Sequence, residues 1–198
     1  WRIDELSYAG EEHLDAQFVS GYDQKAKYDP TEDVDRLREL GLSKESILIE
    51  FGSGTGVFAL AVAPFCQSVI AVDPSPVMND RLREACAQAG VENLSVVKAG
   101  FLSYPSPAEP AGFIFTRNAL HHLPDFWKVQ ALLRMRSMLA AGGIIRIQDL
   151  IFDFPPEESR DRLRAWLAGA VEDASAGWTA AEFAEHLKRE YSTFSWLF

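Results

Sequence analysis

The sequence predicts an α/β protein built on a doubly wound, mostly parallel sheet with helices on both faces. Short apolar runs with β-branched residues recur along the chain, and the first, Ile47–Ile49, is typical of a strand buried on both faces. Segments with helical start and stop signals separate these runs, and alternating strands and helices favour a parallel sheet. Glycines at every second position from Gly52 to Gly56 follow the first run directly, where a strand must turn sharply into a helix. Together these features predict a Rossmann-like architecture.

The first predicted helix, Pro30–Leu40, precedes the first strand. Asp29 can cap it, Pro30 fits its first turn, and Gly41 ends it. The segment before it, from Trp1 to Asp29, is rich in aromatic and charged residues but has no clean period. We therefore expect this segment to be a cap or lid packed on the sheet.

The remaining elements follow from the same kinds of signal. Ser75 can cap a helix that has Pro76 in its first turn and Gly90 after its end, and Thr179 with Glu182 forms a capping box. Further strands are predicted at Val69–Val72, Leu94–Lys98, Phe113–Thr116 and Ile144–Gln148. Further helices are predicted after the glycine turn, at Pro76–Ala89, at Asp125–Leu139 with Gly142–Gly143 as its end, at Glu157–Val171 and at Thr179–Glu190.

Length and composition narrow the class of protein. A chain of 198 residues suits one domain, with an N-terminal helical cap or lid (1–45), a ligand-binding core (46–150) and C-terminal helices (151–198). A net charge of −10 disfavours a nucleic acid or an anionic membrane as partner, because either would be repelled at long range. No apolar run reaches the ~18 residues of a membrane span. Cys66 and Cys86 lack metal-ligand spacing, which fits free thiols in a reducing cytoplasm and no metal site.

Polar residues at the strand ends predict a nucleoside site. Asp73 ends the second strand about twenty residues after Gly52, where a carboxylate can accept both hydroxyls of a ribose. Val57 stands where a dinucleotide fingerprint has its third glycine, and Glu50 would repel a pyrophosphate while attracting an ammonium group. We therefore expect a nucleoside with a positively charged end. A nicotinamide- or flavin-dependent oxidoreductase is the weaker alternative.

The motif Glu50–Gly56, an acid followed by Gly-x-Gly-x-Gly after a hydrophobic strand, resembles the first motif of the class I S-adenosylmethionine-dependent methyltransferases. The segments Asn118–Asp125 and Met138–Gly143 are similar to those before and after the corresponding helix of small-molecule methyltransferases of the type 11/12 kind. The resemblance covers about Tyr22 to Leu150. It implies a Rossmann-like fold, S-adenosyl-L-methionine as cofactor and methyl transfer to a small-molecule acceptor.

The resemblance also implies roles for individual residues. Glu50 would face the methionine amino group, Asp73 would accept the ribose hydroxyls, and Asn118 would lie near the sulfonium. Tyr22 and Tyr28 would belong to a lid over the cofactor. The other implied contacts are Gly52, Ser53, Gly54 and Gly56 at the methionine and ribose, Pro74 and Met78 on one side of the adenine, and Gly100 and Phe101 on the other.

His122 is the residue that we expect to act in catalysis, because it falls where the most recurrent histidine of the family falls and histidine supplies a base near neutral pH. The alternative for His121 and His122 is packing under the loop. Thr116–Ala119 stands where methyltransferases acting on adenine or glutamine amino groups have an Asn/Asp/Ser-Pro-Pro-aromatic motif. Those substrates are therefore disfavoured.

Three departures from the family pattern leave alternatives open. Gly100 and Gly112 stand where the family usually has acids, so a non-catalytic cofactor-binding or assembly protein is a further alternative. The family closes its sheet with two more strands, but only Tyr191–Phe198 follows the last predicted helix. We therefore expect a sheet truncated before its last strands, whose open edge is covered by further residues, a partner or a second copy in a homo-oligomer.

Overall fold

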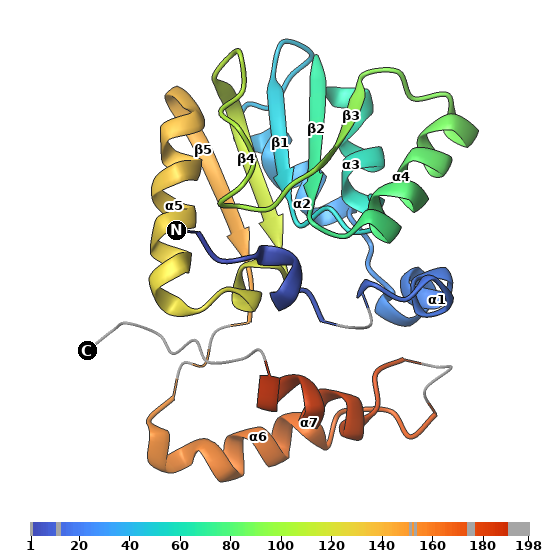
Figure 1. The fold of residues 1–198 in the computed structure, drawn as a ribbon, viewed down its shortest axis with the longest axis vertical. Coiled ribbons are helices and arrows are strands. Elements are labelled where there is room, and N and C mark those ends of the chain that lie inside the picture. The colour runs from blue at the N-terminus through green and yellow to red at the C-terminus, as the bar shows by residue number, and fades with distance from the viewer. Residues whose placement is uncertain (1, 11–12, 151, 153, 174–176, 190–198) are drawn as a thin grey trace.

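The computed structural model describes residues 2–10, 13–150, 152, 154–173 and 177–189. Its centre is a five-stranded sheet in the order β3-β2-β1-β4-β5, and every neighbouring pair of strands is parallel. Figure 1 shows this sheet with helices on both faces and the carboxyl ends of all five strands at one edge. The doubly wound α/β architecture predicted from the sequence is confirmed.

The five strands contain every predicted strand and extend most of them. The central strand β1 pairs Glu50 with Ala71 of β2 on one side and with Phe115 of β4 on the other. The end of β1 therefore lies in the middle of the carboxyl edge. The bounds are β1 Ile47–Phe51, β2 Ser68–Asp73, β3 Leu94–Lys98, β4 Ala111–Arg117 and β5 Leu139–Gln148.

Helices α4 and α7 begin at their predicted caps, whereas α2 begins one residue later than predicted, with Pro30 and not Asp29 at the N-cap. Ser75 accepts a hydrogen bond from the Met78 backbone N–H (3.2 Å) at the start of α4, and Thr179 and Glu182 form the predicted reciprocal capping box before α7. The α-helices are α1 Ala16–Ala26, α2 Thr31–Glu39, α3 Val57–Val62, α4 Pro76–Ala89, α5 Asp125–Met138, α6 Ser159–Leu167 and α7 Ala180–Arg189. Short 3₁₀ helices are η1 Glu5–Tyr8, η3 Ala63–Phe65, η4 Leu120–His122 and η5 Pro156–Glu158.

Two apolar layers hold the helices to the sheet. Helices α2, α3 and α4 cover one face, where Leu37, Phe58 and Leu82 pack around Leu48 of β1. Helix α5 and the loop after β3 cover the other face, where residues such as Met135 pack. These side chains are almost wholly buried, and each contributes roughly 1.5–3 kcal/mol to stability. The paired layers keep the strand ends, and the loops that follow them, in fixed positions.

The boundary between α5 and β5 differs from the sequence-based prediction. The helix ends at Met138, and Leu139 is already paired with Ala111 of β4, so Gly142–Gly143 does not end the helix but lies inside β5. The next paired residue of β5 is Ile144, opposite Phe113. The two glycines therefore lie at an irregularity of β5. Gly142 has a φ of +78°, which a glycine adopts without strain.

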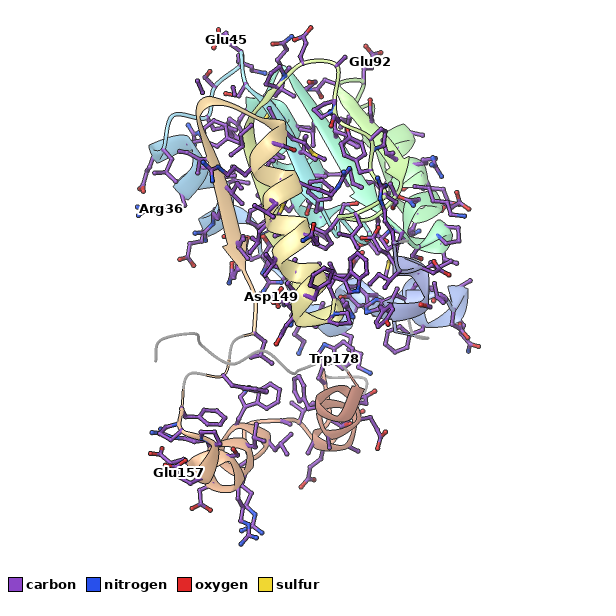
Figure 2. The ribbon with its side chains drawn as sticks, turned by 60° about the vertical axis from the view of Figure 1, so that its left-hand side comes forward. Arg36, Glu45, Glu92, Asp149, Glu157 and Trp178 are labelled. Atoms are coloured by element: carbon purple, nitrogen blue, oxygen red, sulfur yellow. The ribbon has the colours of Figure 1, made fainter. Side chains whose placement is uncertain are left out.

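The C-terminal helices form a pair at the carboxyl edge of the sheet. The predicted helix Glu157–Val171 is shorter in the structure, where α6 begins at Ser159, directly after η5, and ends at Leu167. Figure 2 shows Trp178 between α7 and the sheet, and its ring lies 6.1 Å from the ring of Phe18 in α1. The expectation about the last strands falls on 190–198, which lie outside the described residues. Among the helices that are described, none combines the length and apolarity needed to cross a bilayer.

Candidate functional site

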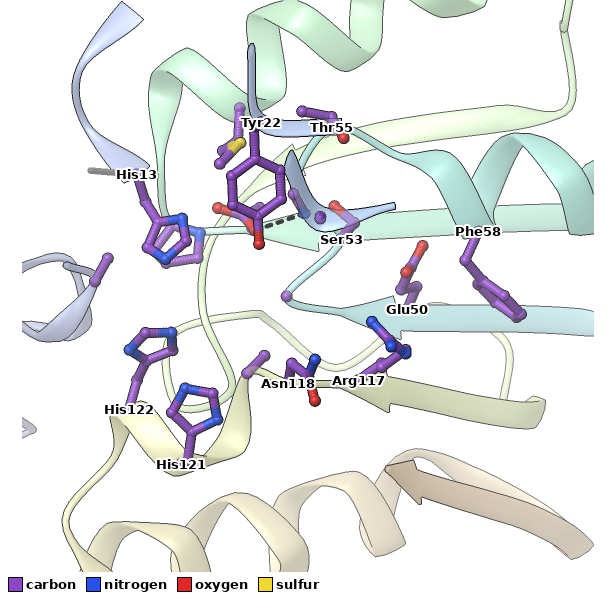
Figure 3. Close-up of a pocket in the computed structure, with 18 of the residues that line it drawn as sticks. His13, Tyr22, Glu50, Ser53, Thr55, Phe58, Arg117, Asn118, His121 and His122 are labelled. Carbon is purple, nitrogen blue, oxygen red and sulfur yellow. Dashed lines mark hydrogen bonds between the residues drawn. The ribbon is translucent and has the colours of Figure 1, made fainter. Parts of the chain in front are cut away.

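A cavity of about 370 Å³ opens at the carboxyl edge of the sheet. Its floor is formed by the loops after β1, β2, β3 and β4, and its walls by η1, α1 and the segment around Trp178 and Phe183. Figure 3 shows how side chains from these separate segments converge on it. Ligands of parallel α/β sheets bind at this edge, and the volume is within the usual range for small-molecule sites.

The structure brings together all but one of the residues that the sequence singled out. Gly56 does not line the cavity: it starts α3 with a φ of +85°, and a Cβ there would meet the Leu82 side chain at 2.0 Å. Its role is to let α4 pack closely against the turn. The predicted residues that do line the cavity are Tyr22, Tyr28, Glu50, Gly52, Ser53, Gly54, Asp73, Pro74, Met78, Gly100, Phe101, Asn118 and His122.

Asp73 is buried at the end of β2, and its carboxylate is fixed by the glycine turn. Its Oδ2 accepts a hydrogen bond from the Gly54 N–H (2.9 Å), and its Oδ1 accepts one from the Ser75 N–H (2.8 Å). Burial raises the pKa of Asp73, while these two hydrogen bonds and nearby His122 oppose the rise. Each carboxylate oxygen has a second acceptor site. The side chain can therefore still accept hydrogen bonds from a ligand diol.

Glu50 presents an unsatisfied buried carboxyl group to the cavity. It is 4% exposed, and its Oε2 has no hydrogen-bond partner. Burial, and secondarily the charge of Asp73, raises the pKa of Glu50 well above its usual value. Unpartnered buried polar atoms are rare in folded proteins. A cationic donor in the cavity would satisfy this oxygen and restore the ionised form.

Two adjacent histidines border the cavity and differ in their surroundings. His121 is buried, and both its ring Nδ1 (2.6 Å) and its backbone N–H (3.1 Å) bond the Asp149 carboxylate at the end of β5. Burial would raise the pKa of Asp149, but the bonds with His121 outweigh it and the pKa is lowered. The His122 ring lies 4.3 Å from that of His121 and 5.5 Å from that of His13, edge to face with the latter.

The N-terminal segment covers the cavity and is anchored to it by polar contacts. The Ser75 hydroxyl donates to the backbone carbonyl of His13 (2.6 Å), and the Thr55 hydroxyl donates to Asp23 of α1. Tyr28 donates to Asp33 (2.7 Å), and burial and Asp33 together raise its pKa. Tyr22 and Tyr28, the two residues expected in a lid, both line the cavity wall.

The loop after β3 contains a carboxylate that the sequence did not reveal. Gly100 lacks the side chain that the family usually has, but the Glu5 carboxylate of η1 fills this place. Its oxygens accept hydrogen bonds from the backbone N–H groups of Leu102 and Ser103, both 2.9 Å. A Cβ on Gly100 would lie 2.4 Å from Glu5 Cδ. Glycine at this position is therefore a condition for Glu5 to enter.

Other lining residues lay beyond the predictions made from sequence. Arg117 is the last residue of β4 and Ala119 follows in the loop, where the strand-end rule points, so their position carried a signal although their roles did not. The sequence gives no signal that Glu5, His13 and Asp23 line the cavity, because only the packing of the N-terminal segment brings them there. His121, weighed with His122 from the sequence, also lines the cavity, and the other lining residues are Ala9, Ala26, Thr55, Val57, Phe58, Leu123, Trp178 and Phe183.

Comparison with known proteins identifies the family of this chain. The sequence profile of a methyltransferase domain matches residues 48–143. An uncharacterized methyltransferase of Geobacillus kaustophilus is 30% identical over 176 residues, which is 88% of this chain and 75% of the relative. The chain belongs to the class I S-adenosylmethionine-dependent methyltransferases.

Solved structures place the methyltransferase among proteins of the same fold. YcgJ of Bacillus subtilis superposes with a TM-score of 0.58 at 23% identity, covering 80% of this chain and 67% of YcgJ. The N-methyltransferase NodS of Bradyrhizobium japonicum, solved with S-adenosylhomocysteine, has a TM-score of 0.50 at 26% identity, covering 59% of this chain and 60% of NodS. The methyltransferase is an enzyme that uses S-adenosylmethionine. The unpartnered Oε2 of Glu50 and the fixed Asp73 carboxylate fit that cofactor's ammonium group and ribose.

Proposed function

We propose that this enzyme transfers the methyl group of S-adenosylmethionine to a small-molecule acceptor held in the same cavity. The observation that carries the proposal is the pair of buried carboxyl groups at the ends of neighbouring strands, Glu50 with one oxygen unpartnered and Asp73 fixed by backbone N–H groups. The covered cavity supports a small acceptor, because η1, α1 and Trp178 enclose it. The net charge of −10 argues against a nucleic-acid acceptor.

The cofactor would lie across the strand ends. Glu50 would bind its ammonium group and Asp73 its ribose hydroxyls, with the backbone of Gly52–Gly54 against the methionine and ribose. Asn118, which has a φ of +48°, would face the sulfonium, and such uncommon backbone conformations cluster at functional sites. Pro74 and Met78 would wall the adenine on one side, and Gly100 with Phe101 on the other.

The chain's own task in the reaction is positioning and proton removal. When bound, the cofactor supplies an electrophilic methyl group on a sulfonium. The cavity residues would hold the acceptor in line with that methyl group and exclude water. His122 would accept the proton that a neutral oxygen or nitrogen acceptor releases, while Asp149 would hold His121 in one tautomer beneath it.

The walls of the cavity indicate the kind of acceptor. Tyr22, Trp178 and Phe183 bring aromatic surface to the side away from the sheet, and His13 with His122 brings ring nitrogens. This mixture suits a small amphipathic molecule with a nucleophilic oxygen or nitrogen. We also propose that residues 1–45 act as the lid of the site and that the enzyme works in a reducing, cytoplasmic setting, which its free thiols Cys66 and Cys86 support.

Calorimetric titration tests the cofactor arrangement. Asp73→Ala should weaken binding of S-adenosylhomocysteine roughly ten- to a hundredfold, as expected for lost charge-assisted hydrogen bonds worth ~1.5–3 kcal/mol. Asp80→Ala, which removes an exposed carboxylate paired with Arg83 on α4, should leave the affinity unchanged. Normal binding by Asp73→Ala, or tight NAD binding by the wild type, would contradict the arrangement.

The acceptor can be sought directly. The wild-type enzyme, incubated with cofactor carrying a labelled methyl group and a metabolite extract, should transfer the label to a small molecule detectable by mass spectrometry. His122→Ala provides the matched low-activity control. Label found only on nucleic acid or protein would overturn the proposed acceptor class.

A further inference from the structure

Acidic side chains outnumber lysine and arginine side chains among the described residues that line the cavity. Four carboxyl groups border it, those of Glu5, Asp23, Glu50 and Asp73, whereas Arg117 is the single arginine or lysine among the described residues that line it. All four carboxyl groups accept a hydrogen bond from a backbone or hydroxyl group, that of Glu50 from the Ala59 backbone. Within the described residues, Glu50 Oε2 and Arg117 Nε are both buried without a hydrogen-bond partner. One unsatisfied acceptor and one unsatisfied donor of opposite charge therefore border the same space.

These two side chains come from neighbouring strands. Arg117 ends β4, which pairs with β1 in a register that places Phe51 opposite Thr116. Figure 3 shows Glu50 and Arg117 at the same end of the cavity, with Asn118 next to Arg117. Both groups influence the pKa of Tyr28, so all three lie close together. Among the described residues, neither Glu50 nor Arg117 takes part in a salt bridge with an N···O distance of 4.0 Å or less, so the two side chains do not pair with each other.

Tyr28 holds the guanidinium without occupying its donors. The Arg117 guanidinium carbon lies 3.9 Å from the centre of the Tyr28 ring. The Tyr28 hydroxyl is anchored to Asp33, whose other oxygen is bonded by Arg146 Nε at 3.0 Å. A guanidinium stacked on an aromatic ring keeps its N–H donors in its own plane. That plane is therefore available for two parallel hydrogen bonds to a carboxylate.

We propose that Arg117, stacked on Tyr28, binds the carboxylate of the methionine end of the cofactor. An amino-acid end carries an ammonium and a carboxylate on one carbon, and the cavity offers one unsatisfied group for each. The assignment rests on the proposed placement of the ammonium at Glu50. It makes Arg117 a residue that distinguishes cofactors with a complete amino-acid end from nucleosides that lack one.

The test compares ligands that differ only at that end. S-Adenosylhomocysteine carries both charged groups, S-adenosyl-3-thiopropylamine lacks the carboxylate, and 5′-methylthioadenosine lacks the whole amino-acid end. Arg117→Met should weaken binding of the first ligand about ten- to a hundredfold, the range for loss of a charge-assisted bidentate contact, and should change the other two less than about twofold. Arg136→Met, an exposed arginine of α5, serves as the matched control and should change none. Arg117→Lys should recover part of the loss, since a point charge replaces a planar fork.

The outcomes separate this inference from the proposed function. Failure of the wild type to bind S-adenosylhomocysteine would contradict the proposed cofactor arrangement itself. Equal weakening of all three ligands by Arg117→Met would mean that Arg117 acts through the overall charge of the cavity, and the inference would be wrong. If Arg117→Met does not fold, as thermal unfolding would reveal, the wild type alone decides: equal affinity for S-adenosylhomocysteine and S-adenosyl-3-thiopropylamine would overturn the assignment.

Discussion

The Glu50 side chain is expected to lower the stability of the ligand-free fold and to favour ligand binding. Its carboxyl group is buried with one oxygen unpartnered, and burial followed by the charge of Asp73 raises its pKa. Folding without ligand at neutral pH therefore requires either an unfavourable buried charge or uptake of a proton. The ligand ammonium would remove this cost. The residue that we propose as a cofactor ligand thus destabilises the ligand-free fold.

This conflict predicts opposite effects of one substitution. Glu50→Gln should raise the thermal unfolding midpoint of the ligand-free enzyme and weaken binding of S-adenosylhomocysteine, because it removes both the buried charge and the partner of the ammonium group. Because the folded pKa is raised, the wild type loses stability relative to the variant as pH rises from the usual value of 4.5 to the folded pKa, and the difference is constant above it. Differential scanning calorimetry across this pH range measures the effect. Glu92→Gln, at an exposed position, is the control, and a variant less stable than wild type at neutral pH would refute the argument.

The two histidines are expected to have different roles, His122 as general base and His121 as its neighbour held by Asp149, and rate measurements can separate them. His122→Ala should lower the rate at saturating acceptor by ~10²–10⁴-fold if it removes a general base, with affinity for S-adenosylhomocysteine little changed. Asp149→Asn should leave His122 in place but replaces the carboxylate that bonds both the Nδ1 and the backbone N–H of His121 with an amide that has one acceptor oxygen, so it should lower the rate less and also destabilise the fold. An unchanged rate in His122→Ala would exclude histidine base catalysis, and steady-state rates with the identified acceptor provide the measurement.

At the scale of elements, η1 and the loop after β3 are fitted to each other. The Glu5 carboxylate sits over Gly100 and accepts N–H groups of Leu102 and Ser103. A side chain at position 100 and the carboxylate of Glu5 exclude each other. The docking of the N-terminal segment on the cofactor cavity therefore depends on a glycine that lies 95 residues further along the chain, as the residue numbers show.

This fit predicts non-additive substitutions. Gly100→Ala should destabilise the enzyme by about 1–3 kcal/mol, because its Cβ would overlap the Glu5 carboxylate. In a Glu5→Ala background the same change should cost much less, so the double-mutant cycle should show coupling. Denaturant unfolding gives the four stabilities. Gly21→Ala in α1, whose Cβ would meet nothing within 4 Å, is the control; additive costs at positions 5 and 100 would show that the contact does not hold the segment.

Local patterns predicted the elements that they specify and missed those that packing specifies. The strand, glycine turn and acid were readable because Gly54 and Asp73 must meet at adjoining strand ends, as their hydrogen bond confirms. The early start of β5 was missed, since Leu139 pairs with Ala111 only through an irregularity that tertiary contacts impose. Glu5 carries no sequence signal for binding, because only the packing of the N-terminal segment brings it to the cavity. The position of Arg117 at a strand end was readable, but its stacking on Tyr28 was not, since spacing along the sequence does not report that contact.

At the scale of the whole molecule, the cavity joins three parts of the chain that are far apart in sequence. The N-terminal segment supplies Glu5 and His13, the sheet supplies the strand-end loops, and the C-terminal pair supplies Trp178. Helix α1 also contacts the C-terminal pair directly, through an ion pair between Lys25 and Glu182. A ligand in the cavity would therefore contact all three parts, and its binding would couple them.

Hydrogen exchange should detect this coupling. S-Adenosylhomocysteine at about 100 times its dissociation constant stabilises the bound state by ~2.7 kcal/mol, which slows by about a hundredfold every opening that requires ligand release. We expect this protection in peptides from η1, α1 and the glycine turn. Peptides from α6, which supplies no lining residue, should exchange at unchanged rates and act as the internal control. The measurement is mass spectrometry of the exchanged enzyme with and without ligand. Protection confined to the strand-end loops would show that residues 1–45 do not close over the cofactor, and the proposed lid would then be only a structural cap of the sheet.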